Sequence, residues 1–210
     1  MKITAIKAQV KREGRYSIFV DGKYAFSLSA ESLLDAGIVN GQELSEADVQ
    51  AYKKLSSDDK AYGLALEYVV RRMRSEGELH DYFRRKKYEP ELAEQIIAKL
   101  KHGGYVDDTE FARRWVENRR LLKATSTKRL RLELQQKKVS SDIIQTVLAE
   151  DETDERQVLR ELIAKKRKQT RYQDSQKLIA YLARQGFNYD DIKSVLGEEA
   201  EAEAEAEAEE

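Results

Sequence analysis

The sequence of 210 residues contains no cysteine and only one proline. Without cysteine the chain has neither disulfide bonds nor thiolate metal sites, a composition typical of the reducing cytosol, so we expect a cytoplasmic protein. No run of about 18 apolar residues is present, which argues against a membrane-spanning helix, and the first residues lack the apolar stretch of a signal peptide. Hydrophobic residues make up 40% and charged residues 37%, so we expect several small cores rather than one large core.

Patterns that support catalysis are also missing. The two histidines, His80 and His102, have no related spacing and are interpreted as surface residues. There is no glycine-rich phosphate loop, no nucleophile motif and no pair of metal ligands. The sequence therefore predicts a non-enzymatic binding protein that uses no cofactor and no metal.

Charge is divided unevenly along the chain. The formal net charge is −1, but the last thirteen residues, Glu198 to Glu210, carry eight glutamates and no base, which leaves −1 + 8 = +7 on residues 1–197. A basic body with an acidic tail is typical of proteins that bind nucleic acid or a nucleoprotein. A tail that only increases solubility is the alternative. Because the tail places glutamates at i, i+4, we expect residues 198–210 to be disordered.

The N-terminal segment, residues 1–56, has the period-two alternation of β-strands. Three apolar sets alternate with polar neighbours, namely Ile6, Ala8 and Val10, then Tyr16, Ile18 and Val20, then Tyr24, Phe26 and Leu28. Asp21-Gly22 is a strong hairpin signal because both central residues of a type I′ turn need positive φ. We expect a three-stranded meander whose apolar face is covered by two short helices, the second capped by Ser45.

From about residue 57 the apolar period becomes helical, and the pattern repeats every 47 residues. Leu64, Ala65, Tyr68 and Val69 recur as Phe111, Ala112, Trp115 and Val116, and again as Val158, Leu159, Leu162 and Ile163. This spacing marks one buried face of a helix. We expect a mainly α protein in which three tandem three-helix repeats, residues 57–106, 107–150 and 151–197, form an elongated array behind the β-rich domain.

The other two helices of each repeat are marked by their ends. Ser75 with Glu78 predicts a capping box, Asp107 with Glu110 predicts the next helix start, and Pro90 suits a first helical turn. On the same basis we expect the rings of Tyr68 and Trp115 to be buried, which leaves Tyr82 and Tyr172 as the weak candidates for stacking on a nucleobase.

Basic residues recur at one position of the repeat. Arg72, Arg119 and Lys166 each lie four residues after the aromatic or leucine position, one turn along the edge of the apolar stripe. Such a series of cations suits a polyanion, because each neutralised phosphate releases counterions. The alternative is that bases near helix C-termini only complement the helix dipole. The candidate binding residues are Arg71, Arg72, Arg74, Arg84, Arg85, Arg113, Arg119, Arg120, Lys123, Lys128, Arg129, Arg131 and Lys166.

Several of these segments together resemble the RecX family. They are Ala65-Leu66-Glu67-Tyr68, Arg71-Arg72-Met73-Arg74-Ser75-Glu76, Gly104-Tyr105-Val106-Asp107-Asp108-Thr109-Glu110-Phe111, Glu133-Leu134-Gln135-Gln136-Lys137-Lys138 and Leu182-Ala183-Arg184-Gln185-Gly186-Phe187. The resemblance covers residues 58–197, and residues 1–56 are similar to the β-rich extension of longer members. Two features depart from the family pattern. Lys87 and Lys138 stand at positions where the family often has glycine, and the Glu/Ala tail is atypical of the family.

The resemblance implies a regulator of the RecA recombinase. Such proteins bind in the groove of the RecA filament on single-stranded DNA, suppress ATP hydrolysis and strand exchange, and favour filament disassembly. The partners implied are the RecA filament and single-stranded or double-stranded DNA, with the chain acting as a monomer. The alternative is a basic α-helical repeat protein that binds nucleic acid directly.

Overall fold

The computed structural model describes the backbone of residues 1–208 and the side chains of residues 1–201. It forms two compact units, the first comprising Met1–Met73 with Tyr82–Tyr105, and the second Arg74–Asp81 with the chain from Val106 onward. The strands are β1 (Ile3–Ala8), β2 (Arg15–Val20) and β3 (Lys23–Ser29). The helices are α1 (Ala30–Asp35), α2 (Glu46–Val70), α3 (Glu76–Lys86), α4 (Pro90–His102), α5 (Asp108–Leu122), α6 (Thr127–Gln136), α7 (Ser141–Glu150), α8 (Glu155–Arg167), α9 (Ser175–Arg184) and α10 (Tyr189–Ala208), with a 3-10 turn, η1, at Thr170–Tyr172.

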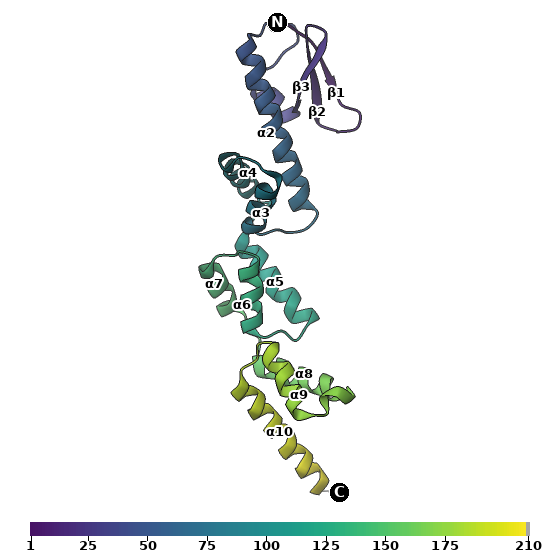
Figure 1. Ribbon diagram of the computed structural model, residues 1–210, viewed down its shortest axis with the longest axis vertical. Helices are drawn as coiled ribbons and strands as arrows, with labels where there is room; N and C mark the ends of the chain where they lie inside the picture. The colour runs from purple at the N-terminus through teal and green to yellow at the C-terminus, as the bar shows by residue number, and fades with distance from the viewer. Residues whose placement is uncertain (209–210) are drawn as a thin grey trace. The chain divides into compact units, whose positions relative to one another are not determined.

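The first unit begins with the expected antiparallel meander in the order β1-β2-β3 (Figure 1). Asp21 and Gly22 both have positive φ, 48° and 77°, so the predicted hairpin between β2 and β3 is confirmed. One face of the sheet carries the core, which includes Ile3, Ile18 and Phe26, and α1 and α2 pack against β3.

A bulge in β3 changes the predicted facing of Tyr24. Ile18 pairs with Phe26, but Phe19 pairs with Tyr24, so Ala25 is an extra residue in the ladder. An extra residue moves everything beyond it to the other face of the strand. The prediction that Tyr24 shares a face with Phe26 is therefore wrong, and the Tyr24 side chain is 59% exposed on the face opposite the core.

Helix α2 is much longer than the predicted short helix. Ser45 caps it through the expected bonds with Asp48, but it then continues for 25 residues, across residues 56 and 57. The Ser-Ser-Asp segment at residues 56–58 does not interrupt it because its neighbourhood is tied to the sheet. Ser56 Oγ donates to the Ser27 carbonyl at 2.6 Å, and Asp59 accepts an ion-paired bond from Arg15 at 2.8 Å. Whether the β-rich segment and the first repeat form separate domains stays a prediction.

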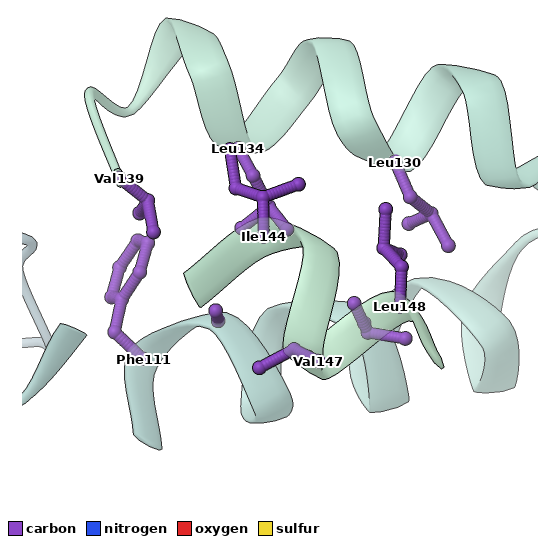
Figure 2. Close-up of a cluster of buried hydrophobic side chains, with 9 residues drawn as sticks. Phe111, Leu130, Leu134, Val139, Ile144, Val147 and Leu148 are labelled. Carbon is purple, nitrogen blue, oxygen red and sulfur yellow. The ribbon is translucent and has the colours of Figure 1, made fainter. Parts of the chain in front are cut away.

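The mainly helical repeats are confirmed. In the second repeat, α5, α6 and α7 enclose a core in which Figure 2 shows side chains of all three helices pointing toward one another. Its buried members are Phe111, Ala112, Val116, Leu130, Leu134, Val139, Ile144, Val147 and Leu148. A corresponding core in the third repeat is formed by Leu159, Leu162, Ile163, Leu178, Leu182, Phe187, Ile192 and Val195. The period of 47 residues thus places Ala65, Ala112 and Leu159 at equivalent buried positions, but Leu64 is 36% exposed where its counterpart Phe111 is buried.

Each second helix ends in the same backbone motif. One or two residues after the helix, a residue has positive φ, at Lys87 (58°), Lys138 (60°) and Gly186 (93°). In each case the next amide donates to the carbonyl five residues earlier, the six-to-one bond of a Schellman motif. Lysine adopts this left-handed conformation at a cost of roughly 1–2 kcal/mol, so the two lysines stand where the backbone favours glycine.

The acidic tail differs from the prediction of disorder. Helix α10 begins at Tyr189 and extends to Ala208, and the buried residues Ile192 and Val195 anchor its first turns. Extending a helix from an existing nucleus avoids the cost of nucleation, and alanine at alternate positions has the highest helix propensity. The residues Glu209 and Glu210 lie outside the described part of the chain.

Across the described residues, no helix combines the length and the apolar character needed to cross a membrane.

Candidate partner-binding surface

A groove of about 430 Å³ lies in the second unit between the second and third repeats. We call it the basic groove. Its wall contains five cations and two carboxylates, together with apolar and neutral polar residues. The charged members are Arg120, Lys123, Arg129, Lys165, Lys166, Glu133 and Glu161. Four of these five cations were predicted binding residues, and the fold brings them together from α5, α6 and α8.

One wall of the basic groove is an ordered cluster around Glu133. Trp115 donates from Nε1 to Glu133 Oε2 at 2.9 Å, and Arg119 donates from Nε to the same oxygen at 2.7 Å. Arg129 lies 3.5 Å from the other carboxylate oxygen. Burial by itself raises the pKa of Glu133, but the bonds from Arg119 and Trp115 and the charges of Arg119 and Arg129 outweigh it and hold the pKa below its ordinary value.

Trp115 is half-buried and packs against the core of the second repeat, so the expectation of a buried ring is met only in part. Its ring packs on the core beside Phe111, with centroids 5.8 Å apart, while cations cover it from outside. The Arg119 guanidinium lies 4.6 Å and the Lys137 ammonium 5.1 Å from the ring centroid. Trp115 lies at the border of the apolar face of α5, so one side of its ring packs on the core while its indole N–H reaches Glu133 near the surface.

The equivalent place in the third repeat has a different composition. Tyr181 precedes Leu182 as Glu133 precedes Leu134, and the Lys166 ammonium lies 4.7 Å from its ring centroid. Lys166 also lies 5.4 Å from the ring of Tyr172. The recurring cations Arg119 and Lys166 therefore both rest on an aromatic ring, with partly buried stems.

Arg120 has a structural role that the sequence did not reveal. Its guanidinium pairs with Asp151 at 2.6 Å, and the two side chains are only 11% and 10% exposed. It also donates to Thr127 Oγ1 and to the carbonyl of Thr125. Burial opposes ionisation of Asp151, yet bonds from Thr153 and Arg120 prevail and lower its pKa. The guanidinium of Arg120 is thus used for bonds within the protein, so Arg120 is a poor candidate for direct contact with a partner.

Exposed leucines at the end of α5 were missed in the sequence. Leu121 is 84% and Leu122 is 70% exposed, and both line the basic groove. Leu121 also borders a second hollow of about 550 Å³ with Arg113 and Val116. Two adjacent exposed leucines beside cations suit a protein partner with an apolar contact. Their position after the periodic stripe, at the helix end, was the available signal.

The other predicted residues of the second unit lie outside the basic groove. Arg113 pairs with Glu150 at 3.1 Å, which raises the Arg113 pKa through the hydrogen bond, and Arg74 lies 3.8 Å from Glu78. Lys128 and Arg131 are exposed on α6 and do not line it. Arg129 and Arg131 flank the buried Leu130, about 100° away from it in opposite directions, so these two bases lie on different faces of α6.

The remaining candidates belong to the first unit. Arg71 caps the C-terminus of α2 and pairs with Glu67, and Arg72 follows the helix and donates from Nη1 to the Met73 carbonyl at 3.0 Å. Arg84 and Arg85 are exposed in the last turn of α3. Tyr82, a weak candidate for base stacking, is instead buried against Tyr68, with ring centroids 4.5 Å apart.

Comparisons with known proteins cover most of the chain. Family models match for the regulatory protein RecX N-terminal domain at residues 1–45 and for the RecX first, second and third three-helix domains at residues 61–100, 107–148 and 153–196. Regulatory protein RecX of Listeria monocytogenes is 31% identical over 94% of this chain and 76% of its own length. That of Lactobacillus johnsonii is 37% identical over 73% of this chain and 56% of its own length. A crystal structure of regulatory protein RecX has a TM-score of 0.77 at 27% identity and covers 93% of this chain and 98% of its own.

Proposed function

Because the chain belongs to the RecX family of regulatory proteins, we propose that it regulates the RecA recombinase by binding in the groove of the filament on single-stranded DNA. In this proposal it acts in the cytoplasm as a monomer, without catalysis, and inhibits ATP hydrolysis, strand exchange and filament growth.

The observation that carries this proposal is the basic groove. Lys123 and Lys165 are exposed in its wall, and neither takes part in an ion pair within the described residues. They are the cations most available to a phosphate or to an acidic side chain of a partner, since each can replace counterions there. Leu121 and Leu122 lie beside them and supply apolar area. A surface with both features suits a nucleoprotein better than bare nucleic acid.

The repeats support the proposed inhibition. Each three-helix repeat presents a similar backbone, so successive repeats suit successive, similar subunits of a filament. A chain bound across two subunits restricts their movement, and ATP hydrolysis in the filament then slows. Arg119 does not itself line the groove, but its bond holds Glu133 of the wall in place, so this part of the wall loses little entropy on binding.

The test is the DNA-dependent ATPase of RecA with the full chain and with a double variant, Lys123→Gln with Lys165→Gln. We expect the variant to need about tenfold more protein for half-inhibition, because it lacks two exposed groove cations. The matched control is Lys128→Gln with Arg131→Gln, which removes the same charge from exposed positions outside the groove and should inhibit like the parent. Equal loss in both variants would mean that net charge matters and the groove does not.

Direct binding of nucleic acid remains the second candidate, favoured by the exposed Lys128 and Arg131 on α6. The two functions differ in stoichiometry. A filament regulator inhibits when it is present at far fewer copies than RecA, whereas a competitor for DNA must match the number of DNA sites. Titration of the ATPase at fixed DNA and increasing RecA separates them.

A further inference from the structure

The first unit contains a pocket of about 450 Å³ between the outer face of the sheet and helix α2. The loop after β1 contributes Arg12, β3 contributes Tyr24, and α2 contributes Lys53 and Lys60. Lys53 and Lys60 are seven residues apart, so they lie on one face of α2, about 10 Å apart along its axis. No acidic side chain lines the pocket.

The floor of the pocket is rigid and its charge is balanced. Arg15 is bound to Asp59 at 2.8 Å, to Ser27 Oγ at 3.1 Å and to the Ser27 carbonyl at 3.0 Å. Ser56 closes the same network with a 2.6 Å bond to the Ser27 carbonyl. This network joins the sheet to α2, and within it the charges of Arg15 and Asp59 neutralise each other.

The rim of the pocket has unbalanced positive charge. Arg12, Lys53 and Lys60 are all exposed, and none of the three forms an ion pair within the described residues. Three unpaired cations around one hollow make it a site for an anion of extended shape, because a single small anion cannot neutralise all of them at this spacing.

An aromatic ring stands at the same rim. The bulge in β3 turns Tyr24 outward, where it is 59% exposed, and its ring meets Phe19 edge to face with centroids 6.1 Å apart. The Lys7 ammonium lies 5.3 Å from the Phe19 centroid and covers that ring. The edge contact fixes the orientation of Tyr24 while leaving the tyrosine side chain accessible.

We propose that this pocket binds a short stretch of single-stranded nucleic acid, with phosphates at Arg12, Lys53 and Lys60 and one base stacked on Tyr24. A cationic groove beside an exposed aromatic ring is the combination that single strands recognise without base sequence. An acidic protein segment would pair with the cations but has no base to stack on the Tyr24 ring. A single-stranded nucleic acid is therefore the occupant that accounts for both features. This site is separate from the basic groove and does not depend on the proposed regulation of RecA.

The test uses the full chain and a fluorescent oligothymidylate, without recombinase, so its outcome is independent of the ATPase experiment. We expect Lys53→Gln with Lys60→Gln to weaken binding at low salt by about fivefold or more and to flatten the log–log salt slope by about 1.4, which is 0.7 for each lost phosphate contact. The control is Lys23→Gln with Lys54→Gln, exposed neighbours that do not line the pocket, and it should change the slope by much less.

Tyr24 tests the stacking directly. Tyr24→Ala should weaken binding about fivefold or more, whereas Tyr24→Phe should keep the parent affinity because the ring remains. Thermal melting shows whether each variant is folded. Photo-crosslinking to oligothymidylate that carries 5-iodouracil should label the peptide containing Tyr24.

Three results would overturn the inference. Crosslinks confined to the helical repeats would place the nucleic acid elsewhere. Equal slopes for the pocket and control double variants would reduce the three cations to general electrostatics. Unchanged affinity in folded Tyr24→Ala, with oligoglutamate competing as well as oligothymidylate, would assign the pocket to an acidic protein segment instead.

Discussion

Ser126 Oγ donates a 2.8 Å hydrogen bond to the main-chain carbonyl of Gln185, which joins the start of α6 in the second repeat to the end of α9 in the third. Ser126 is fully buried and also caps α6 by accepting from the Arg129 amide. Ser75, the cap of α3, makes the equivalent bond to the Lys137 carbonyl at the end of α6. A serine at the same position of the first and second repeats thus caps the start of the second helix and links that helix to the next repeat.

Replacing Ser126 by alanine should lower the free energy of unfolding by about 2 kcal/mol. The loss of the cap accounts for about 1 kcal/mol, and the unsatisfied Gln185 carbonyl accounts for the rest. Ser140→Ala is the matched control. Ser140 caps α7 by accepting from the Ile143 amide and makes no bond to another repeat within the described part of the chain, so its loss should cost only about 1 kcal/mol. Urea denaturation measures both, and equal losses would contradict a linking role.

Replacing Lys87 by glycine should stabilise the protein by about 1 kcal/mol. Lys87 has a φ of 58°, and glycine adopts that conformation without steric cost. Lys86→Gly, one residue earlier and inside α3, should instead destabilise by about 1 kcal/mol, since glycine is a poor helix former. If the backbone conformation decides the effect, chemical denaturation will show changes in the free energy of unfolding of opposite sign for the two variants. A loss of stability in both would contradict the left-handed assignment.

Replacing Asp151 by asparagine should cost about 3 kcal/mol at neutral pH, because it leaves Arg120 buried without a counter-charge. The pKa of Asp151 is lowered in the folded state from its ordinary value of 3.8. The contribution of ionised Asp151 to the free energy of unfolding is therefore complete above pH 3.8 and is lost as the pH falls through the lower folded pKa. The difference in unfolding free energy between parent and variant should narrow below about pH 4. A difference that stays constant from pH 7 to pH 3 would contradict the ion-pair account.

Deleting residues 199–210 should strengthen binding to single-stranded DNA at low salt. The deletion removes seven of the eight tail glutamates but keeps Glu198, which pairs with Arg156 at 2.7 Å and with Arg160 at 3.0 Å. The tail carries like charge to the DNA, and salt screens the repulsion. Affinities measured at low and high salt should differ between the two chains only at low salt. Equal affinities at low salt would make the tail electrostatically passive.

Local features of this fold followed from the sequence because their causes lie within a few residues. Asp21-Gly22 specified its turn through positive φ, and Ser45, Ser75 and Asp107 capped their helices as expected. The period of 47 residues specified the repeated cores, since a helix face depends only on spacing.

The tertiary structure decided which of the many bases are available to a partner. Arg119 and Arg120 are neighbours in sequence, yet one holds Glu133 and Trp115 at the groove wall and the other is buried with Asp151. Tyr24 faces outward only because β2 and β3 pair around an extra residue. Side-chain pairing across tens of residues and strand register depend on how whole elements pack together, and no local pattern in the sequence encodes that packing.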